Sequence, residues 1–306
     1  MRDDAHQTSE SDSGMRASGA PALPDIFLLR AAERALITLG RDVNGLQVIW
    51  TTEARAILLQ KEPAPALFIK VYQEVTQLER EVATMERALA AGIPVAKSLT
   101  FHTGPPAVLI TKRVGGIPLT SAYPLAAEAT GRLLRRFHAL GASPPFVDGQ
   151  RSWSVFIRNW ADREIATMVE HRAISLRHGQ RLHRHFAALD TVLSARPCAL
   201  IHADLQAEHV LIDPVTQRVN ALLDFVDTQP GDPLIDIAVL SLWDTGLARA
   251  VLAGYDAMGN EQTDLLRTYR LLRHLGAANW LTTHGAPAEA TRHEHAVHHY
   301  LSDLPS

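Results

Sequence analysis

The chain has 306 residues, of which 46% are apolar and 21% are charged, proportions that are ordinary for a soluble globular protein of one large or two modest domains. A formal net charge of -3 argues against a nucleic-acid partner, because nucleic-acid binding usually needs a clustered basic face. No apolar run approaches the ~20 residues that span a bilayer, so we expect no membrane partner. The single cysteine, Cys198, excludes an internal disulfide framework and predicts a reducing, cytoplasmic location.

The first 24 residues are polar, rich in serine and glycine, and lack the apolar core of a secretory signal. Such a segment cannot bury enough apolar surface to offset the entropy lost on ordering. We therefore predict a disordered tail over residues 1–24.

Residues 25–114 alternate between helical and strand patterns. The segment 25–40 has helical apolar spacing, and GLQVIW and AILLQ flank a polar link and predict a hairpin. The run ALFIKVY predicts a strand that contains Lys70, and residues 76–91 predict an amphipathic helix. Two further strands, in IPVAKSLTFH and AVLITKRV, lead to a Gly-Gly link.

After that link the patterns are mostly helical. They cover residues 126–140, 153–172, 180–195 and, beyond residue 236, the chain to about residue 300. Three short strand-like pieces, CALIHAD, HVLID and VNALLDF, interrupt them. We predict an α+β chain with a small, β-rich N-terminal lobe with one main helix over residues 25–114. A larger, mostly helical lobe follows over residues 115–306.

Two carboxylates and a histidine come together on the predicted hairpin that begins IHADLQAEHVLID. Asp204 follows a strand, His209 comes five residues later, and Asp224 lies near the end of the strand packed beside it. Phosphoryl transfer needs such a set, because one group must orient the hydroxyl and accept its proton while others hold a metal. Lys70 can supply the cation that contacts nucleotide phosphates, and Glu81 on the following helix can hold that lysine in place.

The order of several motifs resembles the aminoglycoside phosphotransferase family, which has the protein-kinase-like fold. HADLQAEH matches the pattern H-G-D-x-x-x-x-N, LDF matches I-D-F, and GDPLID matches G-D-P-x-x-D. FIKVY, REVATMERALAAGIPVA, LLRRFHAL and LAGYDA match further blocks, so the resemblance covers roughly residues 30–260. It implies transfer of the γ-phosphate of ATP or GTP to a hydroxyl of a small molecule, such as an aminoglycoside or macrolide antibiotic.

The resemblance also implies roles for single residues at the catalytic hairpin. Asp204 would be the catalytic base, and His209 and Asp224 would bind Mg²⁺ or Mn²⁺. Asp236 would brace the catalytic loop from behind. His209 stands where the family pattern has asparagine, and magnesium prefers oxygen ligands to imidazole. Macrolide phosphotransferases resemble the chain in having histidine there, so activity is still expected.

For the nucleotide, the resemblance implies contacts from the lysine strand, its helix, a phosphate loop and a hinge. Lys70 would meet the phosphates with Glu81 as its partner. The predicted nucleotide-binding residues are Lys70, Glu81, Thr51, Thr52, Ile110, Thr111 and Arg113. The sequence contains neither G-x-G-x-x-G nor G-x-x-x-x-G-K-[ST], so hydroxyls of WTTEAR would replace the usual glycines.

The acceptor and the activity leave alternatives open. Candidate acidic residues for a cationic acceptor are Asp162, Glu164, Asp227, Asp244 and Glu261, but the interleaved arginines Arg158, Arg163 and Arg172 prevent a choice by charge. The chain could instead be a metabolite kinase with a choline-, sugar- or amino-acid-like acceptor, or a kinase fold that binds nucleotide without turnover. Lys70 could also be an edge lysine that keeps a strand soluble. A protein kinase is disfavoured, because GDP follows Asp224 within seven residues and leaves no room for a long regulatory loop.

Overall fold

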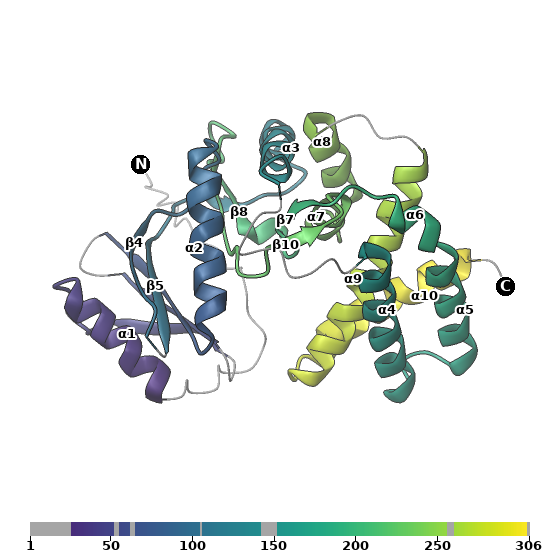
Figure 1. Ribbon diagram of the computed structural model, residues 1–306, viewed down its shortest axis with the longest axis horizontal. Coiled ribbons are helices and arrows are strands. Elements are labelled where there is room, and N and C mark those ends of the chain that lie inside the picture. The colour runs from purple at the N-terminus through teal and green to yellow at the C-terminus, as the bar shows by residue number, and fades with distance from the viewer. Residues whose placement is uncertain are drawn as a thin grey trace, which may run out of the picture.

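The computed structural model describes residues 26–51, 55–61, 65–104, 106–141, 152–255 and 260–304, with the side chains at 50, 51, 260 and 261 left out. The predicted disordered tail therefore lies outside the described residues. A β-sheet with two helices forms one part of the molecule, and a larger group of helices forms the other (Figure 1). The predicted α+β class and two-lobed arrangement are thus confirmed. Within the described ranges, no helix is long and apolar enough to cross a membrane.

The small lobe is built on a five-stranded antiparallel sheet. Its strands are β1 (Leu46–Thr51), β2 (Arg55–Gln60), β3 (Leu67–Tyr72), β4 (Ser98–His102) and β5 (Ala107–Lys112). They lie in the order β1-β2-β3-β5-β4, so the predicted hairpin of β1 and β2 is present. Lys70 stands on the central strand β3. The alternative of an edge lysine is therefore wrong.

The two faces of this sheet pack against different helices. α1 (Ile26–Thr38) packs over one face, on Ile69, Val71 and Ile110, whereas α2 (Val75–Ala90) lies on the other side (Figure 1). Side chains alternate along a strand, so Lys70 points to the α2 side. The sequence predicted that the lysine on this strand would face the following helix. The alternation of side chains along a strand explains why it does.

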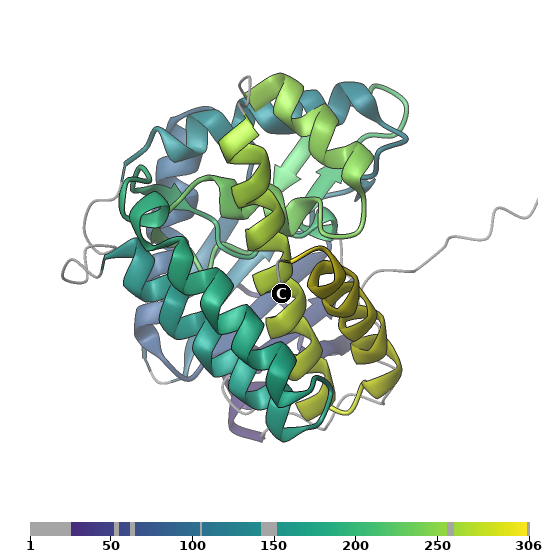
Figure 2. The same ribbon diagram turned by 90° about the vertical axis from the view of Figure 1, so that its right-hand side faces the viewer.

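The large lobe is mostly helical. Its helices are α3 (Pro124–His138), α4 (Trp153–Glu170), α5 (Leu176–Ala188), α6 (Asp190–Ser194), α7 (Leu234–Leu240), α8 (Thr245–Tyr255), α9 (Asn260–Thr283) and α10 (Pro287–Asp303). The helix expected over residues 180–195 is in fact two helices, α5 and α6, which meet at Leu189. Figure 2 shows α4, α5, α9 and α10 grouped on the side of the molecule away from the sheet.

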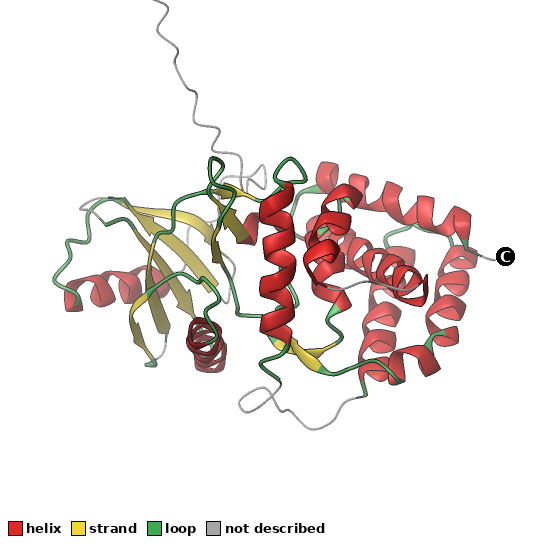
Figure 3. Ribbon diagram, turned by 90° about the horizontal axis from the view of Figure 1, so that it is seen from above, coloured by secondary structure: helices red, strands yellow, loops and turns green. Residues whose placement is uncertain are grey.

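Two small sheets connect the lobes and carry the hairpin predicted from the sequence. β6 (Ile117–Pro118), β8 (Val210–Ile212) and β9 (Val219–Leu222) form one, and β7 (Ala199–Ile201) pairs with β10 (Gln229–Gly231) in the other. The amide of Leu222 donates a hydrogen bond to the carbonyl of Pro94 at 2.9 Å. Seen from above, these short strands lie between the large sheet and the helices (Figure 3). The hydrogen bond from Leu222 to Pro94 holds the end of β9 against the small lobe.

Candidate active site

Lys70 is the centre of a buried ion-pair network. Its Nζ lies 2.6 Å from Glu81 Oε1 and 2.8 Å from Asp224 Oδ1. Glu81 comes from the second turn of α2 and is 2% exposed, and the hydroxyl of Tyr72 donates to its other oxygen. The expected Lys70–Glu81 pair is therefore present, and the structure adds Asp224 and Tyr72 to it. One lysine thus joins the sheet, the helix α2 and the turn that carries Asp224.

Charge balance decides the protonation of this network. Burial lowers the pKa of Lys70, but Asp224 and then Glu81 overcome that effect, so the pKa is raised overall. Burial raises the pKa of Asp224, yet Lys70, His209 and Arg55 together hold it far below its usual range. The lysine is therefore charged and Asp224 is ionised at neutral pH. A cation and an anion fixed beside each other suit the binding of a phosphate together with a metal ion.

The backbone places Asp224 beyond the end of its strand. β9 ends at Leu222, and Asp224 adopts a left-handed conformation with φ of 62°. The amide of Leu223 donates to the carbonyl of His209 at 2.9 Å, which fixes the turn next to the catalytic loop. The sequence placed Asp224 in the right neighbourhood but within the strand. The left-handed residue turns the carboxylate out of the small sheet and toward Lys70.

His209 presents one ring nitrogen to Asp224. Its Nδ1 lies 2.8 Å from the backbone carbonyl of Asp204, and a carbonyl can only accept, so Nδ1 carries the proton. The neutral ring then has its lone pair on Nε2, which lies 3.9 Å from Asp224 Oδ2. A hydrogen bond from the second nitrogen to a carbonyl is the usual way to orient a metal-binding histidine. The described residues form no group of three or more side chains that could hold a metal ion, so His209 and Asp224 are a pair.

Asp236 braces the loop that carries Asp204. Its buried carboxylate accepts from the amides of His202 and Ala203, both at 2.8 Å, and lies 2.9 Å from Nε2 of His138. Ala203 stands where the family pattern has glycine and adopts φ of 68°, a conformation that favours glycine. The two amide hydrogen bonds offset that strain. Because Asp236 fixes both amides, the next residue, Asp204, leaves the strand in a defined direction.

The side chain of Asp204 is held mainly by an arginine that the sequence did not indicate. Nη2 of Arg273, on α9, lies 2.7 Å from Asp204 Oδ1, and the amide of Gln206 lies 3.3 Å or more from either oxygen. The sequence also missed Arg55, whose Nη1 lies 3.7 Å from Asp224 Oδ1. Arg55 is the first residue of β2, the strand that pairs with the lysine strand, and a basic residue at that position could have pointed to the site. No local pattern points to Arg273, which is 69 residues from Asp204.

The predicted nucleotide loop and hinge are only partly placed at the site. Thr51 ends β1, but its side chain and the whole of Thr52 lie outside the described residues. Thr111 lies two residues from Leu109, the residue opposite Lys70, and so shares its face of the sheet. The side chain of Ile110 points the other way, into the core beneath α1, and is fully buried, so the predicted hinge contact at this position concerns its backbone. The amide of Arg113 is already paired, to Ala66 at 2.9 Å.

The acidic residues considered for a cationic acceptor do not form one group. Asp162 pairs with His183 on α5, and Asp244 accepts from the amide of Leu247 at the start of α8. Glu164 accepts from the Trp160 indole and from Asn279. The side chain of Glu261 lies outside the described part of the chain. Asp227, three residues after Asp224, is the one of the five whose pKa is raised, by desolvation and then by the charges of Asp204 and Asp224.

Two tryptophans of α4, Trp153 and Trp160, chiefly pack within the large lobe. Trp153 donates to the hydroxyl of Tyr269 at 2.7 Å and stacks on Phe156. Trp160 is partly exposed and carries the guanidinium of Arg273 over its ring, with 5.6 Å to the ring centre. Trp160 therefore reaches the neighbourhood of Asp204 through Arg273, whereas Trp153 does not.

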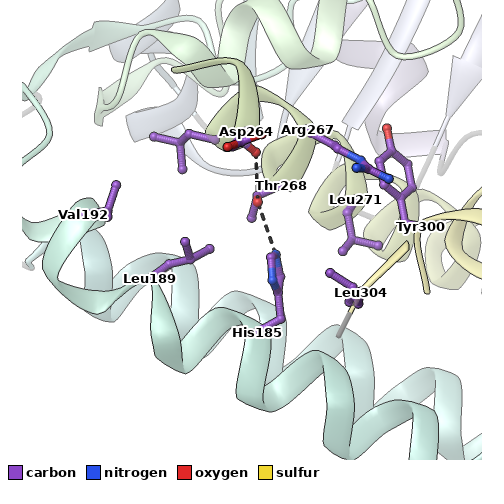
Figure 4. Close-up of a pocket in the computed structure, with 10 residues that line it drawn as sticks. His185, Leu189, Val192, Asp264, Arg267, Thr268, Leu271, Tyr300 and Leu304 are labelled. Atoms are coloured by element: carbon purple, nitrogen blue, oxygen red, sulfur yellow. Dashed lines mark hydrogen bonds between the residues drawn. The ribbon is translucent and has the colours of Figure 1, made fainter. Parts of the chain in front are cut away.

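A separate pocket lies among the helices of the large lobe (Figure 4). It measures about 360 Å³ and lies between α5 and α6 on one side and α9 and α10 on the other. His185, Thr268 and Tyr300 are among its lining residues. None of the predicted site residues lines it, so the pocket is not part of the site described above.

The sequence and the fold can now be compared with known proteins. The model of a phosphotransferase enzyme family matches residues 45–275, which is most of the chain. The chain belongs to this phosphotransferase enzyme family. No curated protein sequence matches it significantly.

Solved structures with a similar fold include aminoglycoside phosphotransferases. A thermostable mutant of aminoglycoside phosphotransferase APH(4)-Ia is 18% identical with a TM-score of 0.62, over 87% of this chain and 97% of that one. The GDP complex of aminoglycoside 2'-phosphotransferase-IIIa is 12% identical with a TM-score of 0.67, over 88% and 98%. APH(3'')-Id from Streptomyces rimosus ATCC10970 is 22% identical with a TM-score of 0.62, over 83% and 99%. At these identities the likeness concerns the fold, and the predicted resemblance is confirmed for family and fold.

Proposed function

We propose that the protein transfers the γ-phosphoryl group of ATP or GTP to a hydroxyl of a small molecule. One observation carries this proposal. Lys70 lies within 2.8 Å of both Glu81 and Asp224, and Asp224 faces His209, whose other nitrogen is fixed by the Asp204 backbone. A phosphate-binding cation, a metal-binding pair and a carboxylate base thus occur in one connected network. Family membership supports phosphotransferase chemistry independently.

Each residue has a distinct part in the proposed reaction. Asp204 orients the acceptor hydroxyl and accepts its proton as the hydroxyl oxygen forms a bond to the γ-phosphorus. The bond from that phosphorus to the bridging oxygen breaks, and its electron pair leaves with the nucleoside diphosphate. Lys70 binds the phosphates, and Glu81 keeps the lysine in position.

The pair of His209 and Asp224 fits a divalent cation. One ionised carboxylate and one lone pair on Nε2 face each other at 3.9 Å, and protein sites for Mg²⁺ commonly use one or two side chains together with substrate phosphates. Such a cation would neutralise charge on the phosphates. Nitrogen suits Mn²⁺ better than Mg²⁺, so either ion belongs to the proposal.

The acceptor, the lobe division and the location remain part of the same proposal. Candidate acceptors are aminoglycosides, which fold relatives modify, macrolides, and hydroxyl metabolites of the choline, sugar or amino-acid type. Residues 25–114 would bind the nucleotide, and residues 115–306 would supply the base and the acceptor site. A cytoplasmic location would give access to ATP and agrees with one free cysteine, Cys198.

A nucleotide-binding protein without turnover is the second candidate. The histidine at position 209 favours it, because the family pattern has an asparagine there. The connected network of Lys70, Asp224 and Asp204 favours an enzyme.

The deciding experiment measures three quantities on the purified protein. Calorimetry gives the affinities for ATP and GTP with Mg²⁺ or Mn²⁺. Mass spectrometry detects a mass gain of one phosphate across a panel of aminoglycosides, macrolides, sugars and amino alcohols, and a coupled assay follows hydrolysis of ATP with water as the acceptor. Binding with phosphorylation of a panel member supports the proposal. Binding with neither phosphorylation nor hydrolysis would favour the second candidate.

A further inference from the structure

Arg273 contacts the predicted catalytic base from the opposite side of the site. It lies on α9, and its Nη2 is 2.7 Å from Asp204 Oδ1. Its guanidinium carbon lies 5.6 Å from the centre of the Trp160 ring, a geometry that is favourable between a cation and the face of an aromatic ring. Two side chains therefore hold Arg273. Asp204 pairs with the end of its guanidinium group, and that group lies over the ring of Trp160.

Two other arginines on this helix are directed elsewhere. Arg270 donates to Ser241 at the end of α7, at 2.7 Å to the hydroxyl and 3.0 Å to the carbonyl. Arg267 pairs with Asp303 on α10. Contact with Asp204 is thus a particular property of Arg273 and not a general effect of a basic helix.

The contact leaves one oxygen of the base for chemistry. Arg273 binds Oδ1, and the Gln206 amide is at 3.3 Å from Oδ2, which is long for a strong hydrogen bond. A carboxylate fixed at one oxygen can no longer rotate freely, so the direction of the other oxygen is set. A general base must lie within hydrogen-bond reach of the proton that it removes, which makes this direction important.

Arg273 also has a donor that the protein does not use. Its Nε is buried and has no hydrogen-bond partner among the described residues. Buried donors in native structures are nearly always paired. Nε of Arg270, on the same helix, is also buried and without a partner among the described residues, so this donor does not by itself indicate a ligand.

We propose that Arg273 is a further residue of the active site. It positions Asp204 by holding Oδ1, so that Oδ2 meets the acceptor hydroxyl. This inference rests on the proposed function, because Asp204 must act as the base.

The test compares Arg273→Gln and Arg273→Lys with Arg267→Gln, a matched change on the same helix. Rates are measured with the best acceptor of the panel and with water as the acceptor in ATP hydrolysis. For Arg273→Gln we expect kcat to fall about 10- to 100-fold with both acceptors, within the range of general-base effects, with KM for ATP unchanged. Arg273→Lys keeps the charge but not the planar fork, so only part of kcat should return. Arg267→Gln should match the wild type.

Two further measurements separate positioning from a general loss of structure. Guanidinium ion at millimolar concentration should partly restore kcat of Arg273→Ala and leave Arg267→Ala unaffected. Carbodiimide labelling followed by mass spectrometry should show Asp204 several-fold more reactive in Arg273→Gln, and this readout needs no turnover. If Arg273→Gln folds and retains kcat within about threefold, or if Asp204 labelling is unchanged, the inference is wrong. A wild type without any phosphoryl transfer would instead refute the proposed function, and with it the part that Arg273 plays there.

Discussion

The two sides of the site differ in burial and in the way their charges are held. On the sheet side, the Lys70 and Glu81 side chains are 14% and 2% exposed. On the helical side, Asp204 and Arg273 are 26% and 22% exposed. Removing one partner of a buried pair is costly because a desolvated charge is left behind, whereas partly exposed charges are screened by water. We therefore expect the sheet side to matter for both binding and stability, and the helical side to leave the proposed base, Asp204, accessible to a substrate.

The largest expected effect concerns the accessible side. Asp204→Asn removes the proton acceptor and should lower turnover by ~10²–10⁴-fold, as general-base catalysis predicts. Nucleotide affinity should stay at the wild-type value, because Asp204 does not contact Lys70. Initial rates and calorimetry measure the two quantities, and Asp162→Asn, which changes an acid paired with His183, is the control. Turnover close to that of the wild type would rule out Asp204 as the base.

The buried side should respond in stability as well as in activity. Lys70→Ala leaves the carboxylates of Glu81 and Asp224 without their shared cation, and breaking a buried pair in this way costs about 3–5 kcal/mol. We expect weaker ATP binding, lower turnover and a lower free energy of unfolding in denaturant titrations. Lys112→Ala, an exposed lysine at the end of β5, is the control. Equal effects of the two substitutions would show that the network around Lys70 does not stabilise the fold.

A smaller effect concerns the pH dependence of stability. The pKa of Asp224 in the folded protein lies below its value of about 3.9 in the unfolded chain. The unfolded state therefore binds the proton more tightly, so the contribution of Asp224 is complete above about pH 4 and is lost as the pH falls below that value. The free energy of unfolding should decline less steeply below pH 4 in Asp224→Asn than in the wild type. Urea titrations from pH 2 to pH 6 measure both slopes, and parallel slopes would contradict the assignment.

The raised pKa of Lys70 predicts that stability falls as the pH rises, the opposite of the effect of Asp224. Its contribution is present below about pH 10.4, the unfolded value, and is lost as the pH rises through the folded value. In the wild type the free energy of unfolding should therefore decline above pH 10.4, and Lys70→Met should flatten this decline. An equal decline in both proteins would mean that groups other than Lys70 cause the loss of stability at high pH.

The smallest effect concerns the choice of metal. His209→Asn replaces the Nε2 lone pair by an amide oxygen, which suits Mg²⁺ better. The ratio of the rate with Mn²⁺ to the rate with Mg²⁺ should fall a few-fold. His183→Asn, an exposed histidine on α5, should leave this ratio unchanged. An identical ratio in His209→Asn and the wild type would mean that His209 does not touch the metal.

Local patterns predicted most of the fold and part of the site. The strand period placed Lys70 on one face of the sheet. The helical period placed Glu81, 11 residues after Lys70, where it could reach that lysine. The same rules placed Asp204 and Asp224 on neighbouring pieces of one hairpin. They failed for residues 180–195, where a helical pattern continues through Leu189 although the chain turns there. A periodic pattern does not encode the direction of the next helix.

What the sequence alone determined is the set of elements and the identity of the chemical groups, because hydrogen bonding and apolar spacing act over a few residues. What only the tertiary structure decided is which distant charges meet. Lys70 reaches Asp224 across 154 residues, and Arg273 reaches Asp204 across 69. Both contacts depend on long-range packing: β9 is held against the small lobe through Leu222, and α9 is packed against α4 and α7. An ion pair over such a separation has no local period, so it exists only once distant segments of the chain have packed together.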